Sequence, residues 1–239
     1  MLRTPGPLID RRGLLQGGLA LAAGVIPQST GAAPASRVWT FDNRHRVGAH
    51  HVTLVGAPTL VASPWGPALS FDGIKDGLFV DEHPLAGAAT FTFEVLFRPD
   101  GGAHEQRWFH LEAEQTPPAP PGKSESRMLF ELRVADCGWY LDAFMTGPGY
   151  RQALMAPAKT FAVGAWYHVA QTYDGQTYRS FVDGELQTEA IVPFVAQGPG
   201  RASVGVRLNQ VNFFRGAVRQ ARFSSMALAP WQFGITARK

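Results

Sequence analysis

Residues 166–188 read WYHVAQTYDGQTYRSFVDGELQT, and this stretch decides the fold class. Two Asp-Gly pairs, at 174–175 and 183–184, separate three short runs that are rich in aromatic and β-branched residues. Asp-Gly between such runs is a strong signal for a tight hairpin turn, because glycine readily adopts the positive φ that the turn needs. The stretch therefore predicts three consecutive antiparallel strands.

Residues 90–99, TFTFEVLFRP, show a period of two: large apolar side chains alternate with polar ones. This pattern predicts a half-buried strand, which Pro-Asp-Gly at 99–101 ends. Further short strands are predicted at residues 38–41, 68–71, 78–80, 107–112, 128–134, 139–144, 151–155, 202–206 and 213–223. So many turn-separated strands predict an all-β, two-sheet antiparallel sandwich of the jelly-roll type, because a single sheet of that width would curl or split.

Composition fits one globular domain. The chain has 239 residues, of which 45% are hydrophobic and 17% charged, enough to bury a core. The formal net charge is +3, but residues 1–35 hold three arginines and one acid, so the rest is nearly neutral. No basic run appears, and nucleic-acid binding is not expected. Cys137 is the single cysteine; it forms no intramolecular disulfide and is interpreted as a small buried apolar residue.

Residues 1–35 have the parts of an export signal: a basic start, an apolar stretch over 14–26 and small residues at 33–35. The segment DRRGLLQ, with Arg11 and Arg12, resembles the bacterial twin-arginine signal, and an ordinary secretory signal is the alternative. The apolar stretch is too short to cross a hydrocarbon core of about 30 Å. We therefore expect cleavage after Ala35 and a periplasmic or secreted domain over 36–239, membrane-associated if the leader is retained.

Four segments carry a family resemblance: Leu69–Gly73 with Asp76 and Val80, Phe91–Arg98, Trp166–Gly184, and Gly216–Phe223 with Leu228. In this order, they resemble the laminin-G-like members of the concanavalin A-like lectin/glucanase superfamily. The resemblance implies a β-sandwich. It constrains function much less, because this fold serves lectins, adhesion domains and glycosidases alike.

The resemblance implies a glycan or protein ligand. Sugar-binding members place flat, exposed aromatic rings against the apolar face of a pyranose. The candidate platforms, for each of which packing in the core is the alternative, are Trp65, Trp108, Trp139, Tyr140 and Tyr150.

The resemblance also implies a calcium site, to which Asp72 and Asp76 would contribute. Calcium needs several oxygen ligands. Arg219 stands where relatives commonly carry an acid, and it would repel the ion or form an internal salt bridge. The alternative is that both acids serve turns and local hydrogen bonds.

The carboxylate motif of the family glucanases, Glu-x-Asp-x-x-Glu or Glu-x-Asp-x-Glu, is absent. Glu112 and Glu114 come nearest, and they are interpreted as a solvated strand end, with a catalytic pair as the alternative. His45, His50 and His51 are interpreted as polar loop residues rather than a metal site, since His50 and His51 would point to opposite faces of a strand. No catalytic residue is assigned.

Residues 114–126 are rich in proline and predict an extended or mobile surface loop, with a partner-docking loop as the alternative. Together these features favour an exported, non-catalytic module that recognises a glycan or a protein. Two alternatives remain: an accessory subunit that stabilises a larger exported or membrane-bound assembly, with a co-exported partner, and a divergent polysaccharide hydrolase or lyase.

Overall fold

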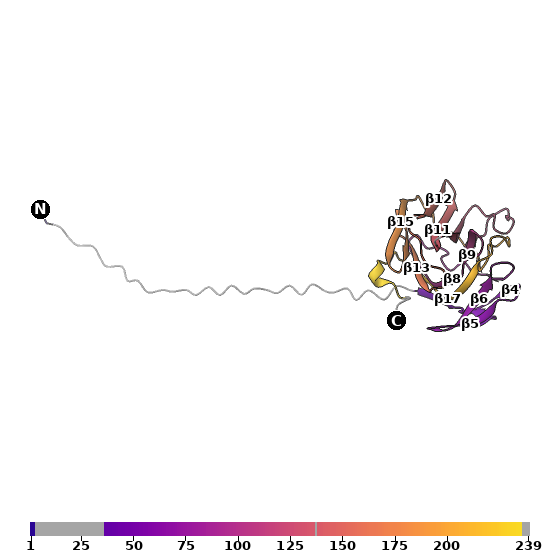
Figure 1. Ribbon diagram of the computed structural model, residues 1–239. Helices are drawn as coiled ribbons and strands as arrows, with labels where there is room; N and C mark the ends of the chain where they lie inside the picture. Colours follow the sequence, from indigo (N-terminus) through magenta and orange to yellow (C-terminus); the bar gives the residue numbers. More distant parts are fainter. Residues whose placement is uncertain (3–35, 137, 236–239) are drawn as a thin grey trace. The chain divides into compact units, whose positions relative to one another are not determined.

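Two antiparallel sheets form the two layers of the fold (Figure 1). The structure is a computed structural model and describes residues 1–2, 36–136 and 138–235. In spatial order, the first sheet contains β15 (Glu185–Ile191), β14 (Thr177–Val182), β13 (Tyr167–Tyr173), β8 (Phe91–Pro99), β17 (Arg215–Ser224), β6 (Gly66–Asp72) and β5 (Thr59–Ser63), and β1 (Ser36–Thr40) also pairs with β17. The second sheet contains β12 (Tyr150–Met155), β11 (Gly138–Gly147), β10 (Arg127–Ala135), β9 (Glu105–Ala113), β16 (Gly200–Val204), β7 (Gly77–Val80) and β4 (Thr53–Val55). A small ribbon, β2 (Arg46–Val47) with β3 (His50–His51), and one 3-10 turn, η1 (Pro230–Gln232), complete the elements.

Aromatic side chains fill the space between the sheets. The Phe93 ring, on β8 of the first sheet, lies 4.1 Å from the ring of Phe130 and 5.0 Å from that of Phe109, both on the second sheet. Phe97 lies 4.8 Å from Trp108 and 5.3 Å from Trp139 across the same space. This packing confirms the predicted two-sheet sandwich, and it needs no disulfide because burial of large rings supplies the main stabilisation.

The outer face of β8 is also buried, although the alternation of its sequence predicts a half-buried strand. Residues 225–235 lie over it: the Thr92 hydroxyl donates to the Met226 carbonyl and accepts from the Leu228 amide, both at 2.7 Å. Glu94 lies at the same face and accepts backbone hydrogen bonds further along this segment. The half-buried prediction is wrong because a non-adjacent segment covers the polar face.

The predicted strand positions agree with the structure from β6 onward to within a few residues at each end. β4 and β5 were missed by the sequence analysis. They are edge strands with largely exposed or half-buried side chains, so they lack the burial that produces a clear period of two. In the part of the chain that the structure describes, no helix is long and apolar enough to cross a membrane.

Candidate functional site

The outer face of β10 is the base of the candidate site. Arg127, Leu129, Glu131 and Arg133 occupy alternate positions of this strand, and the residues between them pack in the core. Because side chains alternate across a strand, these four all project from the sandwich on one side. The strand therefore presents three charged groups and one apolar group to its surroundings.

Neighbouring strands extend this face into a groove of about 460 Å³. Its volume lies within the range of about 300–1,000 Å³ that is typical of small-molecule sites. The lining comes from four adjacent strands and from the connection between β16 and β17, and it comprises Arg107, Arg127, Leu129, Glu131, Arg133, Asp142, Phe144, Arg151, Ala153, Met155 and Arg207. We call this feature the arginine groove.

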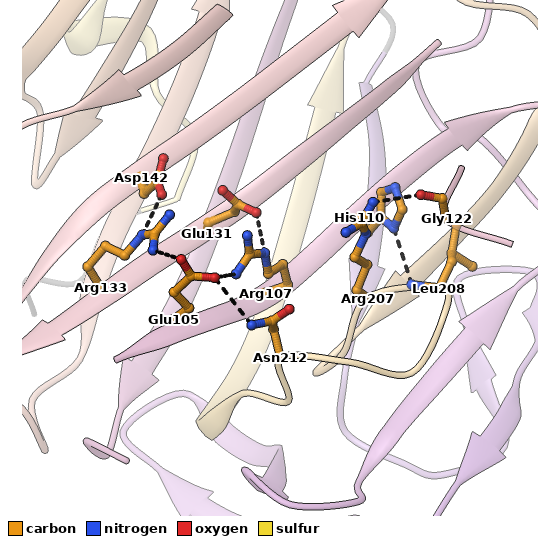
Figure 2. A network of polar contacts seen from close by, with 10 residues as sticks. All are labelled: Glu105, Arg107, His110, Gly122, Glu131, Arg133, Asp142, Arg207, Leu208 and Asn212. Carbon is orange, nitrogen blue, oxygen red and sulfur yellow. Dashed lines mark hydrogen bonds and ion pairs between the residues drawn. The ribbon is translucent and has the colours of Figure 1, made fainter. Parts of the chain in front are cut away.

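A chain of ion pairs holds one end of the arginine groove (Figure 2). Arg133 donates from Nε to Asp142 Oδ2 at 2.7 Å and pairs through Nη1 with Glu105. Glu105 also pairs with Arg107 at 2.8 Å, and Arg107 pairs through Nε with Glu131. Two arginines and three acids are thus joined in one network, which fixes the orientation of the charged groups.

Glu105 and Glu131, the two glutamates of this ion-pair network, have pKa values shifted in opposite directions. Hydrogen bonds from Arg107 and then Arg133 lower the pKa of Glu105 to about 2. Burial raises the pKa of Glu131 to about 7, because its desolvation outweighs the attraction of Arg107, and the nearby Asp142 acts in the same direction as burial. Glu105 is therefore a fixed anion, whereas Glu131 exchanges a proton near neutral pH.

The other end of the groove carries positive charge without acidic partners. Among residues 36–136 and 138–235, no carboxylate forms an ion pair with Arg127, Arg151 or Arg207. Arg127 and Arg207 donate to backbone carbonyls, those of Ser124 and Gly122, the latter at 2.7 Å. These bonds orient the two guanidinium groups, and Glu112 and Glu131 act on them as nearby charges without forming an ion pair with either.

Phe144 lies close to two of these arginines. The guanidinium carbon of Arg127 is 5.6 Å from the ring centroid, and that of Arg151 is 5.2 Å from it. Both distances are within the range of cation–π attraction. The half-buried ring forms an aromatic surface in the groove, with two cations close to it.

His110 is fully buried beneath the connection that carries Arg207 (Figure 2). Its Nδ1 accepts the Leu208 amide at 3.2 Å, which requires an unprotonated nitrogen. Burial, followed by the charges of Arg207 and other nearby arginines, lowers the pKa of His110 well below its usual value. The histidine is therefore neutral and serves to position the connection.

The proline-rich loop, residues 114–126, accepts hydrogen bonds from two arginines of the groove. It is tied down by Arg207 at Gly122 and by the Ser124 amide, which donates to Glu112 at 3.3 Å. The same loop lines a second hollow of about 720 Å³ together with Glu112, Glu114 and Arg201. The structure has no strand within residues 114–126, as predicted, and these contacts join the loop backbone to β9 and to the connection that carries Arg207.

Glu112 corrects one expectation. It is buried and pairs with Arg201 at 3.0 Å, so it is not part of a solvated strand end, whereas Glu114 is exposed. Its burial follows from the loop that covers the end of β9, which the sequence pattern of the strand does not reveal.

Three of the predicted aromatic platforms pack in the core. Trp108 and Trp139 have no exposed surface, and Tyr150 is buried as well. They point between the sheets because they share a face with other core residues of their strands. The prediction that their rings receive a sugar is therefore wrong.

The other two aromatic candidates are half-buried. Trp65 lies in the turn between β5 and β6, with its ring 5.9 Å from that of Trp166. Tyr140 projects from the outer face of β11, the face that carries Phe144. Phe144 and the arginines were not predicted as site residues, although the period of two in Arg127-x-Leu-x-Glu-x-Arg133 is a signal for the outer face of β10.

Asp72 and Asp76 both hold turns. Asp72 Oδ1 accepts the amides of Ile74, Lys75 and Asp76 at 2.8–3.0 Å, and Asp76 Oδ1 accepts the Ala57 amide at 2.8 Å. No group of three or more His, Cys, Asp or Glu among the described residues is arranged around a metal. Calcium binding stays a prediction, and a rise in melting temperature on calcium addition is its test.

Arg219, expected to repel a cation or form a salt bridge, instead donates from Nε to the Trp65 carbonyl at 3.0 Å. His50 and His51 form the short strand β3, and the ring of His50 lies 6.0 Å from that of Trp39. Cys137, Arg11, Arg12 and the expected cleavage point lie outside the described residues.

Comparison with known proteins places the chain in a family. Residues 72–232 match the model of the family Laminin_G_3, of the concanavalin A-like lectin/glucanases superfamily. The chain belongs to this family. No curated protein matches it.

Several solved structures share the fold. Domain 4 of AbnA, a GH43 extracellular arabinanase from Geobacillus stearothermophilus, in complex with arabinotriose, has a TM-score of 0.58 and 15% identity; the match covers 82% of this chain and 94% of that one. The CBM40 of a Ruminococcus gnavus IT-sialidase, bound to α2,3-sialyllactose, has a TM-score of 0.51 and 13% identity. The match covers 75% of this chain and 95% of that one. A heptameric SAP-like pentraxin from Limulus polyphemus has a TM-score of 0.52 and 15% identity. The match covers 68% of this chain and 77% of that one. At these identities the likeness establishes the fold alone.

Proposed function

We propose that this protein is an exported, non-catalytic recognition module that binds a glycan in the arginine groove. The observation that carries the proposal is the combination of an aromatic ring, apolar side chains and oriented hydrogen-bond donors in one groove. A saccharide presents apolar C–H faces and many hydroxyl groups, so it needs both kinds of surface. Periplasmic or secreted localisation is part of the proposal and rests on the leader.

The apolar part of the groove is formed by Leu129, Phe144, Ala153 and Met155. Leu129 and Phe144 come from adjacent strands and are paired in register, and Ala153 pairs with Phe144 on the other side. The three side chains thus form a continuous row across β10, β11 and β12. Leu129 is buried, so a pyranose ring would lie on Phe144 and Ala153 while its hydroxyl groups meet the arginines around them.

The comparisons add support to this proposal. Two of the similar structures contain saccharides, arabinotriose and α2,3-sialyllactose, on the same sandwich architecture. The family itself is named for lectins and glucanases. A glycan is therefore the ligand class most consistent with both the groove and the relatives.

Calorimetric titration of the full-length protein with glycans selected from an array tests the proposal. We expect Phe144→Ala to weaken binding at least tenfold, which corresponds to about 1.4 kcal/mol, because the sugar loses its aromatic surface. Trp231→Ala is the matched control: Trp231 is 86% exposed on η1, outside the groove, and its removal should change affinity less than twofold. Absence of any glycan ligand, or equal affinities for the wild type and Phe144→Ala, would contradict the proposal.

One observation favours a second function, hydrolysis of a polysaccharide. Glu131 and Asp142 are opposite each other on β10 and β11, and the raised pKa of Glu131 is a property of general acids. Each of these acids is nevertheless paired with an arginine, which favours a structural role. Release of reducing ends by the wild type, and its loss in Glu131→Gln, would establish hydrolysis in place of simple binding.

A further inference from the structure

The arginine groove has an excess of positive charge. Five arginines and two acids line it, and both acids are already paired with arginines. Arg127, Arg151 and Arg207 are left without an anionic partner among the described residues. A neutral ligand would leave this charge uncompensated, whereas an anion would neutralise it.

Two of these three guanidinium groups are partly withdrawn from water. The Nε atoms of Arg127 and Arg207 are buried and have no hydrogen-bond partner among residues 36–136 and 138–235. Burial, followed by the charge of Arg207, lowers the pKa of Arg127, and burial, followed by the charge of Arg107, lowers that of Arg207. Like charges that repel one another in a partly dry site are stabilised by a shared anion.

The cations are also held in place before any ligand arrives. The carbonyls of Ser124 and Gly122, both in the proline-rich loop, fix one nitrogen of Arg127 and one of Arg207. Arg127 and Arg151 both lie within cation–π distance of the Phe144 ring. Pre-positioned guanidinium groups lose little conformational entropy on binding, which favours a tight contact with a planar carboxylate.

We propose that the ligand of the arginine groove is an acidic saccharide, whose carboxylate binds to Arg127, Arg151 and Arg207 while its ring lies on Phe144. This inference rests on the proposed glycan-binding function and names its ligand class. A carboxylate that is a substituent of the sugar ring fits the geometry, because Arg127 and Arg151 lie within 5.6 Å of the centroid of the aromatic ring and Arg207 lines the same groove. The groove of about 460 Å³ is a bounded site, unlike the continuous basic track that a nucleic acid requires.

The test compares acidic sugars with their own neutral forms. Trigalacturonate, a mannuronate trisaccharide and sialyllactose are titrated into the full-length protein, each beside its methyl ester, which keeps the ring and removes the charge. We expect at least one acid to bind ten times more tightly than its ester. We also expect binding to weaken as sodium chloride is raised, because ions screen the contact.

Variants locate the contact. Arg127→Gln and Arg151→Gln should each weaken binding of the acid at least tenfold while affecting the ester little. Arg151 is exposed, so Arg151→Gln keeps the test decisive if Arg127→Gln does not fold. Arg179→Gln is the matched control, because Arg179 lies on β14 of the other sheet and pairs with Asp174 and Glu189.

The outcomes separate the inference from the function on which it rests. The protein could bind neutral glycans, lose this binding in Phe144→Ala, and show no preference for any acid over its ester. That result would overturn the inference and leave the proposed function standing. Equal or tighter binding of a single-stranded oligonucleotide would show a general anion site and would also overturn it. Binding of no glycan at all would remove both.

Discussion

Glu131 has an unusual protonation state among the carboxylates of the described chain. It lies between Arg107 of β9, Arg133 of its own strand and Asp142 of β11, and burial raises its pKa to about 7 from an ordinary value of 4.5. The folded protein therefore keeps a proton at pH values where the unfolded chain has lost it. This proton stabilises the folded state below pH 4.5, and its contribution disappears as the pH rises from about 4.5 to 7.

Glu131→Gln should make the stability of the protein less dependent on pH. The free energy of unfolding of the wild type is expected to fall by about 2 kcal/mol more than that of the variant between pH 4.5 and 7.5, because the amide has no proton to lose. Urea unfolding at several pH values measures the difference. Glu189→Gln, an exposed acid, is the control. Parallel curves for the wild type and Glu131→Gln would show that Glu131 titrates normally.

At the scale of elements, the outer face of β8 and the C-terminal segment depend on each other. Glu94 has no exposed surface, and its Oε1 accepts the amides of Gly234 and Ile235 at 2.8 and 3.1 Å. His168 of β13 and Arg222 of β17 complete its surroundings at 3.3 and 3.2 Å. One buried carboxylate thus joins three strands to a segment that has no strand of its own.

Glu94→Ala should destabilise the protein by about 3 kcal/mol, because it leaves Arg222 and two backbone amides without their buried partner. Urea unfolding measures the loss, and hydrogen exchange should show faster exchange of the Gly234 and Ile235 amides. Glu189→Ala is the control: Glu189 pairs with Arg179 at the surface and should matter by less than about 0.5 kcal/mol. Equal stability of the two variants would mean that the segment is held by its apolar contacts alone.

At the scale of the whole molecule, the fold collects charges that the sequence disperses. The sequence shows no basic run, and residues 36–239 are nearly neutral. The second sheet nevertheless brings five arginines from three strands and one connection to a single groove. The net charge of the chain therefore bears on its solubility and does not predict the charge of its binding site.

The leader is also a property of the whole chain, and export tests it. Replacement of Arg11 and Arg12 by lysine should retain the protein in the cytoplasm of a bacterial host that has the twin-arginine pathway, because that pathway reads the arginine pair. Cell fractionation with immunoblotting measures the distribution. The same double replacement at the exposed Arg44 and Arg46 is the control and should leave export unchanged. Normal export of the leader variant would indicate the ordinary secretory route.

Local sequence patterns determined the architecture. The Asp-Gly pairs at 174–175 and 183–184 and the period of two in 90–99 predicted strands that the structure contains as β8, β13, β14 and β15. Such patterns are readable because strand pairing repeats every two residues and because tight turns need particular residues. The two-sheet sandwich was predicted from them.

The candidate site needed the tertiary structure. Trp108 and Phe144 are both aromatic residues within predicted strands, yet Trp108 lies in the core and Phe144 lies in the groove. Their burial differs because it depends on which face of the sheet the opposite sheet covers. Arg127, Arg151 and Arg207 are far apart in sequence, and only strand pairing and the fastened loop bring their side chains to one groove. The sequence of a single strand defines which side chains share a face. Contacts between distant segments decide which face is covered and which charges meet on the open face.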